Sequence, residues 1–428
     1  MNTPIYDFLR KYNDSSALRL HMPGHKGRDT VPLSYGLDIT EIHGADSLFE
    51  ADGIICESEK NASSLFGSKA TLYSAGGSTL CIQTMLSIAK RDKRQVIAVR
   101  NVHRSFIAAC VLLGIEPIWT YPDYSAGFLS GSINMNDLEE KLSSAERPCV
   151  YITSPDYLGR QADIKTTAEL VHRYNGILIV DNAHGAHLAG SKLHPINQGA
   201  DMCCDSAHKI LPCLTGGAYL HIGNERYVKN AKQEMSLFAS TSPSYLIMMS
   251  LDICNDYIEK KLSQDKERIE TLLSELRERI GKRYTIYNSE PFHLTLLCDG
   301  NDLAEKLRQR GIECEYADSF CLVLLFSPVN THDDISRLEK ALTEITPKPP
   351  KPMSQTSFPK MERVMTIREA ALSEYETVPA EKSEGRICAA VNVPCPPAVP
   401  IAVSGERINE GAVKIFQKYG ILSVNVVK

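Results

Sequence analysis

Hydrophobic and polar positions follow two different periods along the chain, and these periods alternate between residues 61 and 225. Apolar side chains recur at helical spacing from Ser78 to Arg91 and again from Arg104 to Leu113. Short runs that are almost entirely apolar, such as Gln95–Val99 and Gly176–Asp181, separate the helical stretches. Continuous apolar runs are typical of parallel strands that are covered on both faces. The alternation therefore predicts an α/β fold built on a mostly parallel sheet.

The remaining segments predict how the rest of the chain is organised. We expect an N-terminal arm at residues 1–60, irregular in structure, and a large α/β domain at residues 61–250. Short strands with two predicted helices indicate a smaller α/β domain at 251–346. The proline-rich stretch 347–359 is typical of an extended linker. Residues 360–428 are expected to form a C-terminal domain, an appendage to the two α/β domains.

Composition and charge exclude several classes of protein. The chain has 428 residues, of which 43% are hydrophobic and 23% charged, as in a globular protein of more than one domain. Its net charge of −5 argues against a general nucleic-acid binder, which would carry a basic surface. No run approaches the roughly 18 apolar residues of a membrane span, and the N-terminus lacks the apolar core of a signal peptide. We therefore expect a cytoplasmic protein with neither a membrane nor a nucleic-acid partner.

The cysteines add little chemistry to this picture. There are 13 of them, and none are spaced as a Cys-x-x-Cys pair. In a chain of this size without a secretion signal, a disulfide framework is not expected. The spacing also argues against a zinc ribbon. Most of the thiols are expected to serve as small buried hydrophobic groups.

Two charged residues stand in apolar surroundings. Asp181 ends the apolar run 176–181, so its carboxylate is expected at the carboxyl end of a strand, where parallel sheets bind ligands. Lys209 lies downstream in a mostly uncharged stretch, next to His208 and close to Ser206. A partly desolvated lysine loses its proton more readily and forms imines with aldehydes. The plainer interpretations are a capping aspartate and a lysine on a surface loop.

A glycine-rich turn and a histidine complete the set of candidates. Gly77, Ser78 and Thr79 precede the first helix, where backbone N–H groups and hydroxyls favour a phosphate. A plain N-cap is the alternative. His103 follows a predicted strand, where an imidazole can lie flat on an aromatic ring or simply occupy a turn. A lysine for the aldehyde, an acid for the pyridine nitrogen and a helix start for the phosphate are what pyridoxal phosphate requires.

His184 and His187 raise the alternative of a metal site. With Asp181 they offer one carboxylate and two imidazoles within seven residues. The glycine between the histidines disfavours the helix on which zinc proteases carry their paired histidines. A further strong ligand is not evident nearby, so no metal is predicted.

Beyond these residues, the order of the motifs resembles a known family. The chain is similar to the Orn/Lys/Arg decarboxylases, which have the aspartate-aminotransferase-like fold (fold type I) and use pyridoxal phosphate. The resemblance covers nearly the full length, as a short form without the N-terminal wing domain of the large members. It rests on strings that include Leu20-His-Met-Pro-Gly-His-Lys-Gly27, Asn101-Val-His-Arg-Ser105, Asp181-Asn-Ala-His184, Ser206-Ala-His-Lys209 and Pro396-Pro-Ala-Val-Pro400.

The resemblance implies a role for each candidate residue. Lys209 would hold the cofactor aldehyde, Asp181 would pair with the pyridine nitrogen, and His103 would stack on the ring. His184 would lie near the phenolic oxygen of the ring. The other residues implied to bind the cofactor, mainly through its phosphate, are Gly77, Ser78, Thr79, Ser206, His208 and Ser242, with Ser242 reaching the phosphate of a neighbouring subunit.

These roles imply α-decarboxylation of a basic amino acid (lysine, ornithine or arginine), giving a polyamine or its precursor. Glu406 would help to place the distal cation of the substrate, and His21 would also contact the substrate. A homodimer or a higher even oligomer with shared active sites is implied. The chain departs from the family at Ser47, Gly76 and 215–218, which leaves the substrate open. Another fold type I reaction (aminotransfer, aldol cleavage or elimination) and a non-catalytic relative remain the alternatives.

Overall fold

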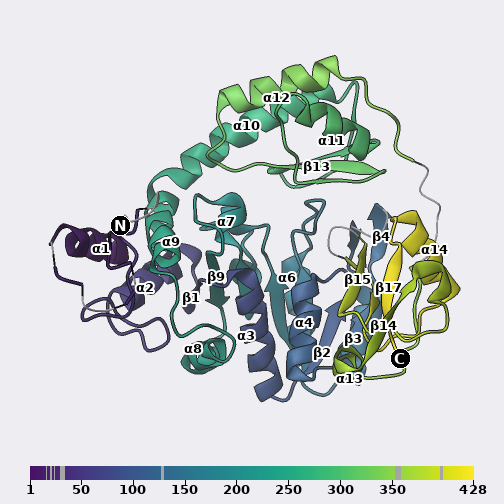
Figure 1. The fold of residues 1–428 in the computed structure, drawn as a ribbon, viewed down its shortest axis with the longest axis horizontal. Coiled ribbons are helices and arrows are strands. Elements are labelled where there is room, and N and C mark those ends of the chain that lie inside the picture. The colour runs from purple at the N-terminus through teal and green to yellow at the C-terminus, as the bar shows by residue number, and fades with distance from the viewer. Residues whose placement is uncertain are drawn as a thin grey trace. The chain divides into compact units, whose positions relative to one another are not determined.

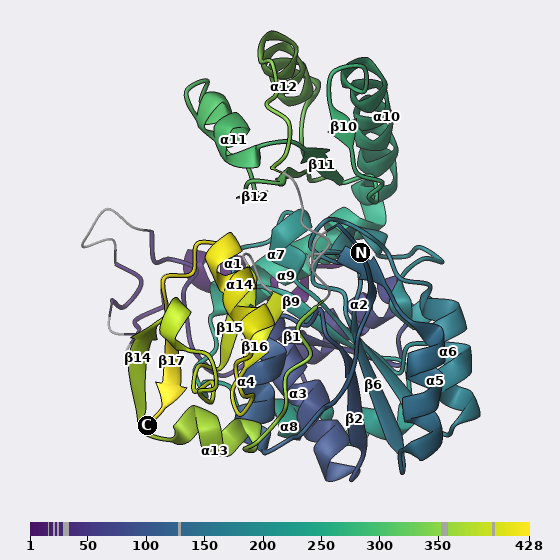
Figure 2. The same ribbon diagram turned by 90° about the vertical axis from the view of Figure 1, so that its right-hand side faces the viewer.

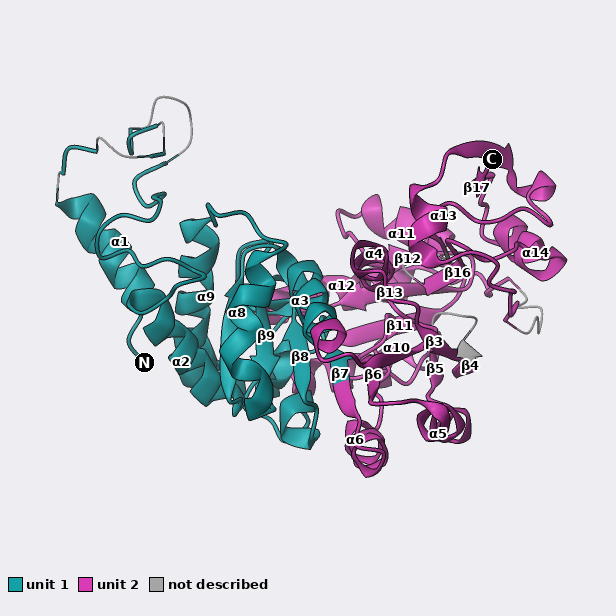
Figure 3. Cartoon of the chain, turned by 90° about the horizontal axis from the view of Figure 1, so that it is seen from below, with its two compact units in different colours: residues 1–88, 179–269, 327–329 teal, residues 89–178, 270–326, 330–428 magenta. Residues whose placement is uncertain are grey.

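The chain divides into two compact units, which are coloured separately in Figure 3. The computed structural model describes residues 1–15, 17–19, 22–23, 25–28, 34–126, 130–351, 358–395 and 399–428. Unit 1 comprises residues 1–88, 179–269 and 327–329, and unit 2 comprises residues 89–178, 270–326 and 330–428. Helices and strands alternate through most of both units, as the sequence pattern predicts (Figure 1). The division falls inside a strand, β7 (Ile177–Asp181), so the predicted domain boundaries stay a prediction.

Four strands pair in unit 1. In spatial order they are β1 (Ala70–Ser74), β9 (Ala218–Ile222), β8 (Met202–Asp205) and β7. β9 runs antiparallel to both β1 and β8, whereas β7 and β8 are parallel. Every residue of β7, β8 and β9 is buried, which fits their continuous apolar sequences. The parallel register aligns Asp181 with Cys204, so the two strands end at one edge of the sheet.

The helices of unit 1 come from three parts of the chain. They are α1 (Pro4–Asp14), α2 (Ile54–Phe66), α3 (Gly77–Arg91), α7 (Ala207–Ile210), α8 (Val228–Ser236), α9 (Tyr245–Tyr257) and α10 (Ser263–Ile280), of which α3 and α10 run on into unit 2. A π-helical segment, Ile258–Leu262, connects α9 to α10. None of the helices in the described part of the chain is both long and apolar enough to cross a membrane.

The N-terminal segment differs from its expectation. Residues 1–60 are not irregular throughout, because α1 and the first half of α2 lie within them. Ile5 and Leu9, one helical turn apart on α1, are at most 1% exposed and share a core with Ile55 of α2. Apolar residues four positions apart bury one face of a helix. The expectation of an irregular arm is therefore wrong for α1.

Unit 2 contains a parallel set of strands. In spatial order they are β6 (Pro148–Thr153), β2 (Gln95–Val99) and β3 (Ile118–Thr120). The accompanying elements are α4 (Arg104–Leu113), the hairpin of β4 (Asp123–Ala126) and β5 (Ser130–Ser132), α5 (Met135–Ser144) and α6 (Ile164–Arg173). β2 and α4 have the bounds that the sequence predicts. Because β2 ends just before α4, the residues between them, 100–103, lie at the carboxyl edge of this sheet.

A second, antiparallel sheet belongs to the same unit. Its strands, in spatial order, are β10 (Thr285–Ile286), β11 (His293–Leu297), β13 (Cys321–Leu325) and β12 (Tyr316–Ala317). The helices α11 (Gly300–Arg308) and α12 (His332–Glu344) lie on one side of this sheet (Figure 1). These elements lie within 251–346, the segment for which the sequence predicts a smaller α/β domain.

Within its described residues, the C-terminal part adds two strand pairs and two α-helices. β14 (Tyr375–Pro379) pairs with β17 (Ser423–Val427), and β15 (Asn392–Cys395) pairs with β16 (Val399–Val403). The helices are α13 (Ile367–Leu372), which contacts α4 (Figure 2), and α14 (Glu410–Lys418). One hydrophobic core joins residues of β16 and α14 to Cys321 and Val323 of β13. The C-terminal part and the small sheet are therefore packed together rather than joined by a linker alone.

Candidate active site

Asp181 is the buried acid at the carboxyl edge of the unit 1 sheet. It is the last residue of β7, and its side chain is 2% exposed. Its Oδ1 accepts a hydrogen bond from the backbone N–H of Ala183 at 3.2 Å. The Sγ of Cys204 lies 3.7 Å from the same oxygen and donates to it. A carboxylate in a dry position of this kind can hold a proton on a pyridine nitrogen.

Lys209 approaches the loop that carries this acid. It belongs to the short helix α7, which begins two residues after β8. Its Nζ lies 2.9 Å from Nε2 of His184, which is 6% exposed and three residues beyond Asp181. Since both atoms bind protons, the contact requires one of the two groups to be unprotonated at that atom. The contact places the amine beside the segment that contains the acid.

The start of α3 is the predicted phosphate site, which we call the anion cradle. Gly77 has φ +66, in the left-handed region that favours glycine, and its N–H donates to the carbonyl of Gly216 at 2.8 Å. A Cβ on Gly77 would meet nothing within 4 Å among the described residues, so the space there is open. Ser78 Oγ accepts a hydrogen bond from Ser206 Oγ at 2.9 Å. The N-terminus of a 15-residue helix with two hydroxyls beside it suits a phosphate.

Other candidates of unit 1 occupy less specific positions. Thr79 is exposed in the first turn of α3. His208 donates from Nδ1 to the carbonyl of Gly217 at 2.9 Å, because a carbonyl oxygen can only accept. Ser242 is exposed in the loop before α9, where its N–H donates to Ser240 Oγ at 3.1 Å. His21 lies outside the described residues.

The residues of unit 1 fit pyridoxal phosphate. An amine stands beside the loop that carries a buried carboxylate, and Ser206 reaches the first turn of α3 from the segment that bears Lys209. Gly77 leaves open space above that turn, as a phosphate would need. The lysine, the acid and the helix start that the cofactor requires all belong to unit 1.

His103 belongs to unit 2, where it caps α4. Its backbone is extended (φ −74, ψ 155), and its Nδ1 accepts from the N–H of Ser105 at 3.3 Å. The same atom lies 2.8 Å from Ser105 Oγ. The imidazole is held at Nδ1 and is exposed. Stacking on the cofactor ring stays a prediction.

Glu406 has a partner that the sequence analysis missed. Its Oε2 accepts from Nη2 of Arg100 at 2.7 Å and from the N–H of Val403 at 2.8 Å, with both charged side chains buried. Burial alone would lower the pKa of Arg100, but the Glu406 carboxylate outweighs it and raises that pKa. The guanidinium also lies over the ring of Trp119, 4.5 Å from its centroid. The predicted contact of Glu406 with a substrate cation stays a prediction.

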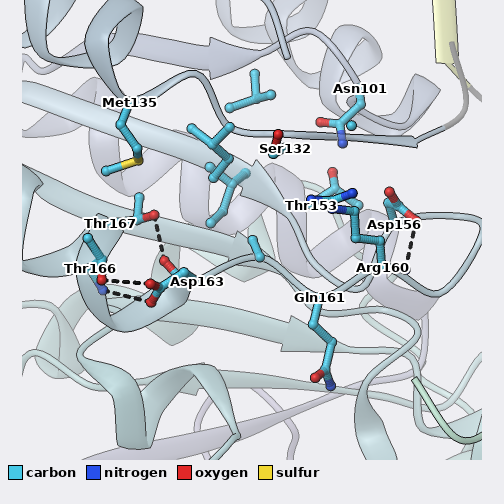
Figure 4. A pocket seen from close by; sticks show the side chains of 15 residues that line it. Asn101, Ser132, Met135, Thr153, Asp156, Arg160, Gln161, Asp163, Thr166 and Thr167 are labelled. Carbon is cyan, nitrogen blue, oxygen red and sulfur yellow. Dashed lines mark hydrogen bonds between the residues drawn. The ribbon is translucent and has the colours of Figure 1, made fainter. Parts of the chain in front are cut away.

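Unit 2 also contains a pocket of about 260 Å³ at the carboxyl ends of β2 and β6 (Figure 4). Its polar lining includes Asn101, Thr153, Asp156, Arg160 and Asp163. The carboxylate of Asp156 accepts from the N–H of Arg160 at 3.0 Å, and burial raises its pKa to about 6. Asp163 caps α6 by accepting from the N–H of Thr166. The acids of this pocket are thus engaged in local bonds.

The structure groups residues that could bind a metal ion, but they are not the histidines of the metal site considered above. Among the histidines and acids that the structure describes, the group close enough to share an ion is His194, Asp205 and His221. Neither His184 nor His187 belongs to it. This group could not be recognised from the sequence, because its members lie on separate elements.

Comparison with known proteins gives matches over most of the chain. Residues 3–297 match the family model for the major domain of Orn/Lys/Arg decarboxylase, and residues 351–421 match the model for its C-terminal domain. The uncharacterized protein YaaO of Bacillus subtilis (strain 168) is 30% identical, over 97% of this chain and 93% of its own length. An arginine decarboxylase of the same organism is 28% identical, over 95% of this chain and 91% of its own length.

Solved structures show the same fold. Lysine decarboxylase A from Pseudomonas aeruginosa has a TM-score of 0.82 at 17% identity and covers 99% of this chain and 80% of its own. A structure of SPT with PLP has a TM-score of 0.54 at 12% identity, over 67% of this chain and 74% of its own. The expected fold type I architecture, with a mostly parallel sheet, is confirmed by these likenesses. The family and the fold together imply pyridoxal phosphate as the cofactor.

Proposed function

The chain belongs to the Orn/Lys/Arg decarboxylase family, and on this premise we propose that it removes the α-carboxyl group of a basic amino acid with pyridoxal phosphate. The observation that carries the proposal is the 2.9 Å contact between Lys209 Nζ and His184 Nε2, close in sequence to buried Asp181. When bound, the cofactor supplies an electron sink for the electron pair that carbon dioxide leaves behind.

The protein's own groups divide the work among them. Lys209 would hold the cofactor through Nζ and release it to the substrate amine. Asp181 would keep the pyridine nitrogen protonated. The first turn of α3, with Ser78 and Ser206, would hold the phosphate, and His103 would cover one face of the ring. Together these groups would hold the ring in the orientation that the reaction requires.

A proton must then return to the α-carbon. We assign this step to the pair of Lys209 and His184, because their contact already joins two proton-binding atoms. Asp181, His184 and Ser206 are each at most 6% exposed, so water is largely excluded from their side. In such a dry site fixed charges act more strongly than they would in water.

The proposed substrate is lysine, ornithine or arginine, and the proposed product is a polyamine or its precursor. Relatives of this chain are named arginine decarboxylase, and its structural neighbours are named lysine decarboxylase. Removal of the carboxylate from any of the three leaves an amine that keeps its side-chain cation. Glu406 would act on that cation while paired with Arg100, and His21 would contact the same substrate.

We further propose a cytoplasmic homodimer, or a higher even oligomer, without nucleic-acid or membrane partners. In it Ser242 would reach the phosphate of the partner's site. Ser242 is exposed at the start of the segment leading into α9, which such a contact would require. Analytical ultracentrifugation of the wild-type protein and Ser242→Ala, with cofactor affinity measured for both, tests this point. A monomer that binds the cofactor with undiminished affinity would contradict it.

The first experiment joins a spectrum to an assay. The purified protein is scanned in the visible range before and after borohydride, and carbon dioxide release is then measured with lysine, ornithine and arginine separately. We expect a yellow band that reduction removes, with the cofactor fixed to Lys209 in the peptide map. Carbon dioxide from one of the three amino acids would identify the substrate.

Two lysine variants accompany this experiment, one that tests the role of Lys209 and one that is its matched control. Lys209→Ala should lose the band and at least about 10³-fold of turnover, since it removes the residue that holds the cofactor. Lys192→Ala, at an exposed position of the same unit, should keep both. A yellow protein that releases no carbon dioxide from any of the three would favour another fold type I reaction. A protein that cannot bind the cofactor at all would favour a non-catalytic relative.

A further inference from the structure

Three fully buried side chains of unit 1 meet around one carboxylate. Asp205, His194 and His221 are each 0% exposed. Oδ2 of Asp205 lies 3.2 Å from Nε2 of His194 and 3.4 Å from Nε2 of His221. Asp205 is the last residue of β8, directly before Ser206 and four residues before Lys209. The group thus lies at the start of the segment that carries Lys209.

The other oxygen of Asp205 holds the segment that carries the acid. Oδ1 accepts from Nδ2 of Asn182 at 2.7 Å, and Asn182 directly follows Asp181. The N–H of Gly185 donates to the carbonyl of Asn182 at 2.7 Å. A Cβ on Gly185 would lie 2.0 Å from Oδ1 of Asn182, so the amide packs tightly under the loop at His184. Asn182 therefore connects Asp205 to the loop that runs from Asp181 through His184 to Gly185.

His221 extends the network to β1, the strand that precedes the anion cradle at Gly77. Its Nδ1 lies 2.8 Å from Oγ1 of Thr71. Its ring also packs against Phe66, with centroids 4.2 Å apart. Asp205 is thus linked, directly or through one side chain, to the three segments that lead into Lys209, Asp181 and Gly77.

The two histidines stabilise the ionised carboxylate of Asp205. Burial alone would raise the pKa of Asp205, but the charges and hydrogen bonds of His194 and His221 outweigh it and hold that pKa well below its usual value. Burial lowers the pKa of His221 despite the nearby carboxylate. Removing one partner from a buried charged group is costly, because the remaining charge stays desolvated. We therefore expect the network to be costly to disrupt and to hold its segments in fixed positions.

We propose that Asp205 is a positioning residue for the cofactor site, fixing the lysine segment through the backbone and the Asp181–His184 loop through Asn182. This inference rests on the proposed function only for its activity readout. A displacement of about 1 Å far from the reacting atoms can lower a rate about 10²-fold. The side chain of Asp205 itself touches neither cofactor nor substrate.

The test compares three variants with the wild type. Asp205→Asn removes the negative charge at nearly constant volume. Asn182→Ala keeps Asp205 and its two histidines but removes the hydrogen bond between Asp205 and the loop. Asp252→Asn is the matched control, because Asp252 is a buried acid of the same unit whose Oδ2 accepts from the N–H groups of Ile5 and Tyr6 on α1.

Hydrogen exchange of residues 181–187 is measured first, in the protein freed of cofactor. We expect faster exchange in Asp205→Asn and Asn182→Ala and unchanged exchange in Asp252→Asn. With cofactor added, the first two variants should bind it more weakly, and kcat should fall about 10- to 100-fold with little change in KM. The double variant should lose no more cofactor affinity or kcat than the more impaired of the two single variants, because both substitutions act through one link.

Two outcomes would overturn the proposal. The first is exchange and cofactor affinity in Asp205→Asn equal to those of the wild type. The second is a stoichiometric metal ion in the wild type that is lost in Asp205→Asn, which would make the trio a metal site instead. If the wild type binds pyridoxal phosphate but decarboxylates nothing, the proposed function fails while the exchange and affinity results still decide the role of Asp205.

Discussion

Nζ of Lys209 and Nε2 of His184 lie 2.9 Å apart, which joins two proton carriers across two separate segments of unit 1. An ammonium can donate to a neutral imidazole, or a protonated imidazole can donate to a neutral amine, but two protonated atoms cannot make this contact. Removal of a proton from one group is therefore tied to the state of the other. Such coupling suits a step in which a proton is held and then delivered to carbon.

Replacing His184 by Gln should separate proton transfer from cofactor binding. Glutamine keeps a polar group near Nζ but cannot carry a titrating proton, so kcat should fall about 10²- to 10⁴-fold while the visible band persists. The pH profile of kcat should lose one limb. His332→Gln, at an exposed position of α12, is the control and should behave as the wild type. A profile of unchanged shape in His184→Gln would assign the proton to another group.

Asp181→Asn should preserve the fold and lower turnover. The amide has the same size but no negative charge, so the pyridine nitrogen loses its partner and kcat should fall at least about 10²- to 10³-fold. Covalent attachment to Lys209, read from borohydride reduction, should remain. Asp201→Asn removes another buried acid of unit 1, one that accepts from Asn224 Nδ2, and should keep activity. Equal activities in the two variants would remove Asp181 from the site.

The anion cradle can be tested with two glycines of similar conformation. Gly77 and Gly385 have φ +66 and +77, and a Cβ on either would meet nothing within 4 Å among the described residues. Replacing either by alanine should cost about 1–2 kcal/mol of stability through left-handed strain alone. Only Gly77→Ala should also weaken cofactor binding, measured by titration of the protein freed of cofactor. Similar affinities in the two variants would mean that the phosphate lies elsewhere.

The buried pair of Arg100 and Glu406 predicts a non-additive loss of stability. Glu406→Gln leaves a buried guanidinium, whose Nε and Nη1 have no hydrogen-bond partner among the described residues, without its carboxylate. We expect a loss of about 3–5 kcal/mol, measured by thermal or denaturant unfolding. Replacing both residues by methionine should cost much less. If Glu406→Gln instead keeps its stability and raises KM alone, the carboxylate serves the substrate and not Arg100.

Asp252 predicts a specific dependence of stability on pH. Burial raises its pKa from 3.8 to about 6, so the folded state holds the proton more tightly than the unfolded chain does. Its stabilising contribution is therefore complete below about pH 4 and is lost as the pH rises through 6, a change of about 3 kcal/mol. Asp252→Asn should lack this loss, so the two unfolding curves should converge or cross between pH 4 and 7. Parallel curves would contradict the shifted pKa.

Local pattern was sufficient for many elements of the fold. β2 and α4 appear with the predicted bounds because each is a continuous apolar or helical run that needs no distant partner to define it. The end of α13 at Leu372 is not such a case, because Tyr375 soon begins a strand that pairs with the far end of the chain, at Val427. Pairing over such a separation leaves no local signal.

The candidate site shows the same limit. The sequence placed Asp181 and Lys209 in apolar surroundings, but it did not reveal that Cys204 stands beside Asp181, because that contact depends on the register of two strands. The trio around Asp205 also escaped notice, since its histidines lie on other elements. Residue type and position along the chain identify groups that can do chemistry, whereas tertiary packing decides what orients them.

The partnership of Arg100 and Glu406 has a consequence for the order of events during synthesis. The two residues are 306 positions apart. A ribosome adds about 5–20 residues per second, so Glu406 emerges roughly 15 to 60 s after Arg100. During that interval the guanidinium must stay hydrated, because a lone buried cation is too costly. The end of β2 can therefore reach its final packing only late in translation, and until then the nascent chain depends on water or a chaperone at that edge.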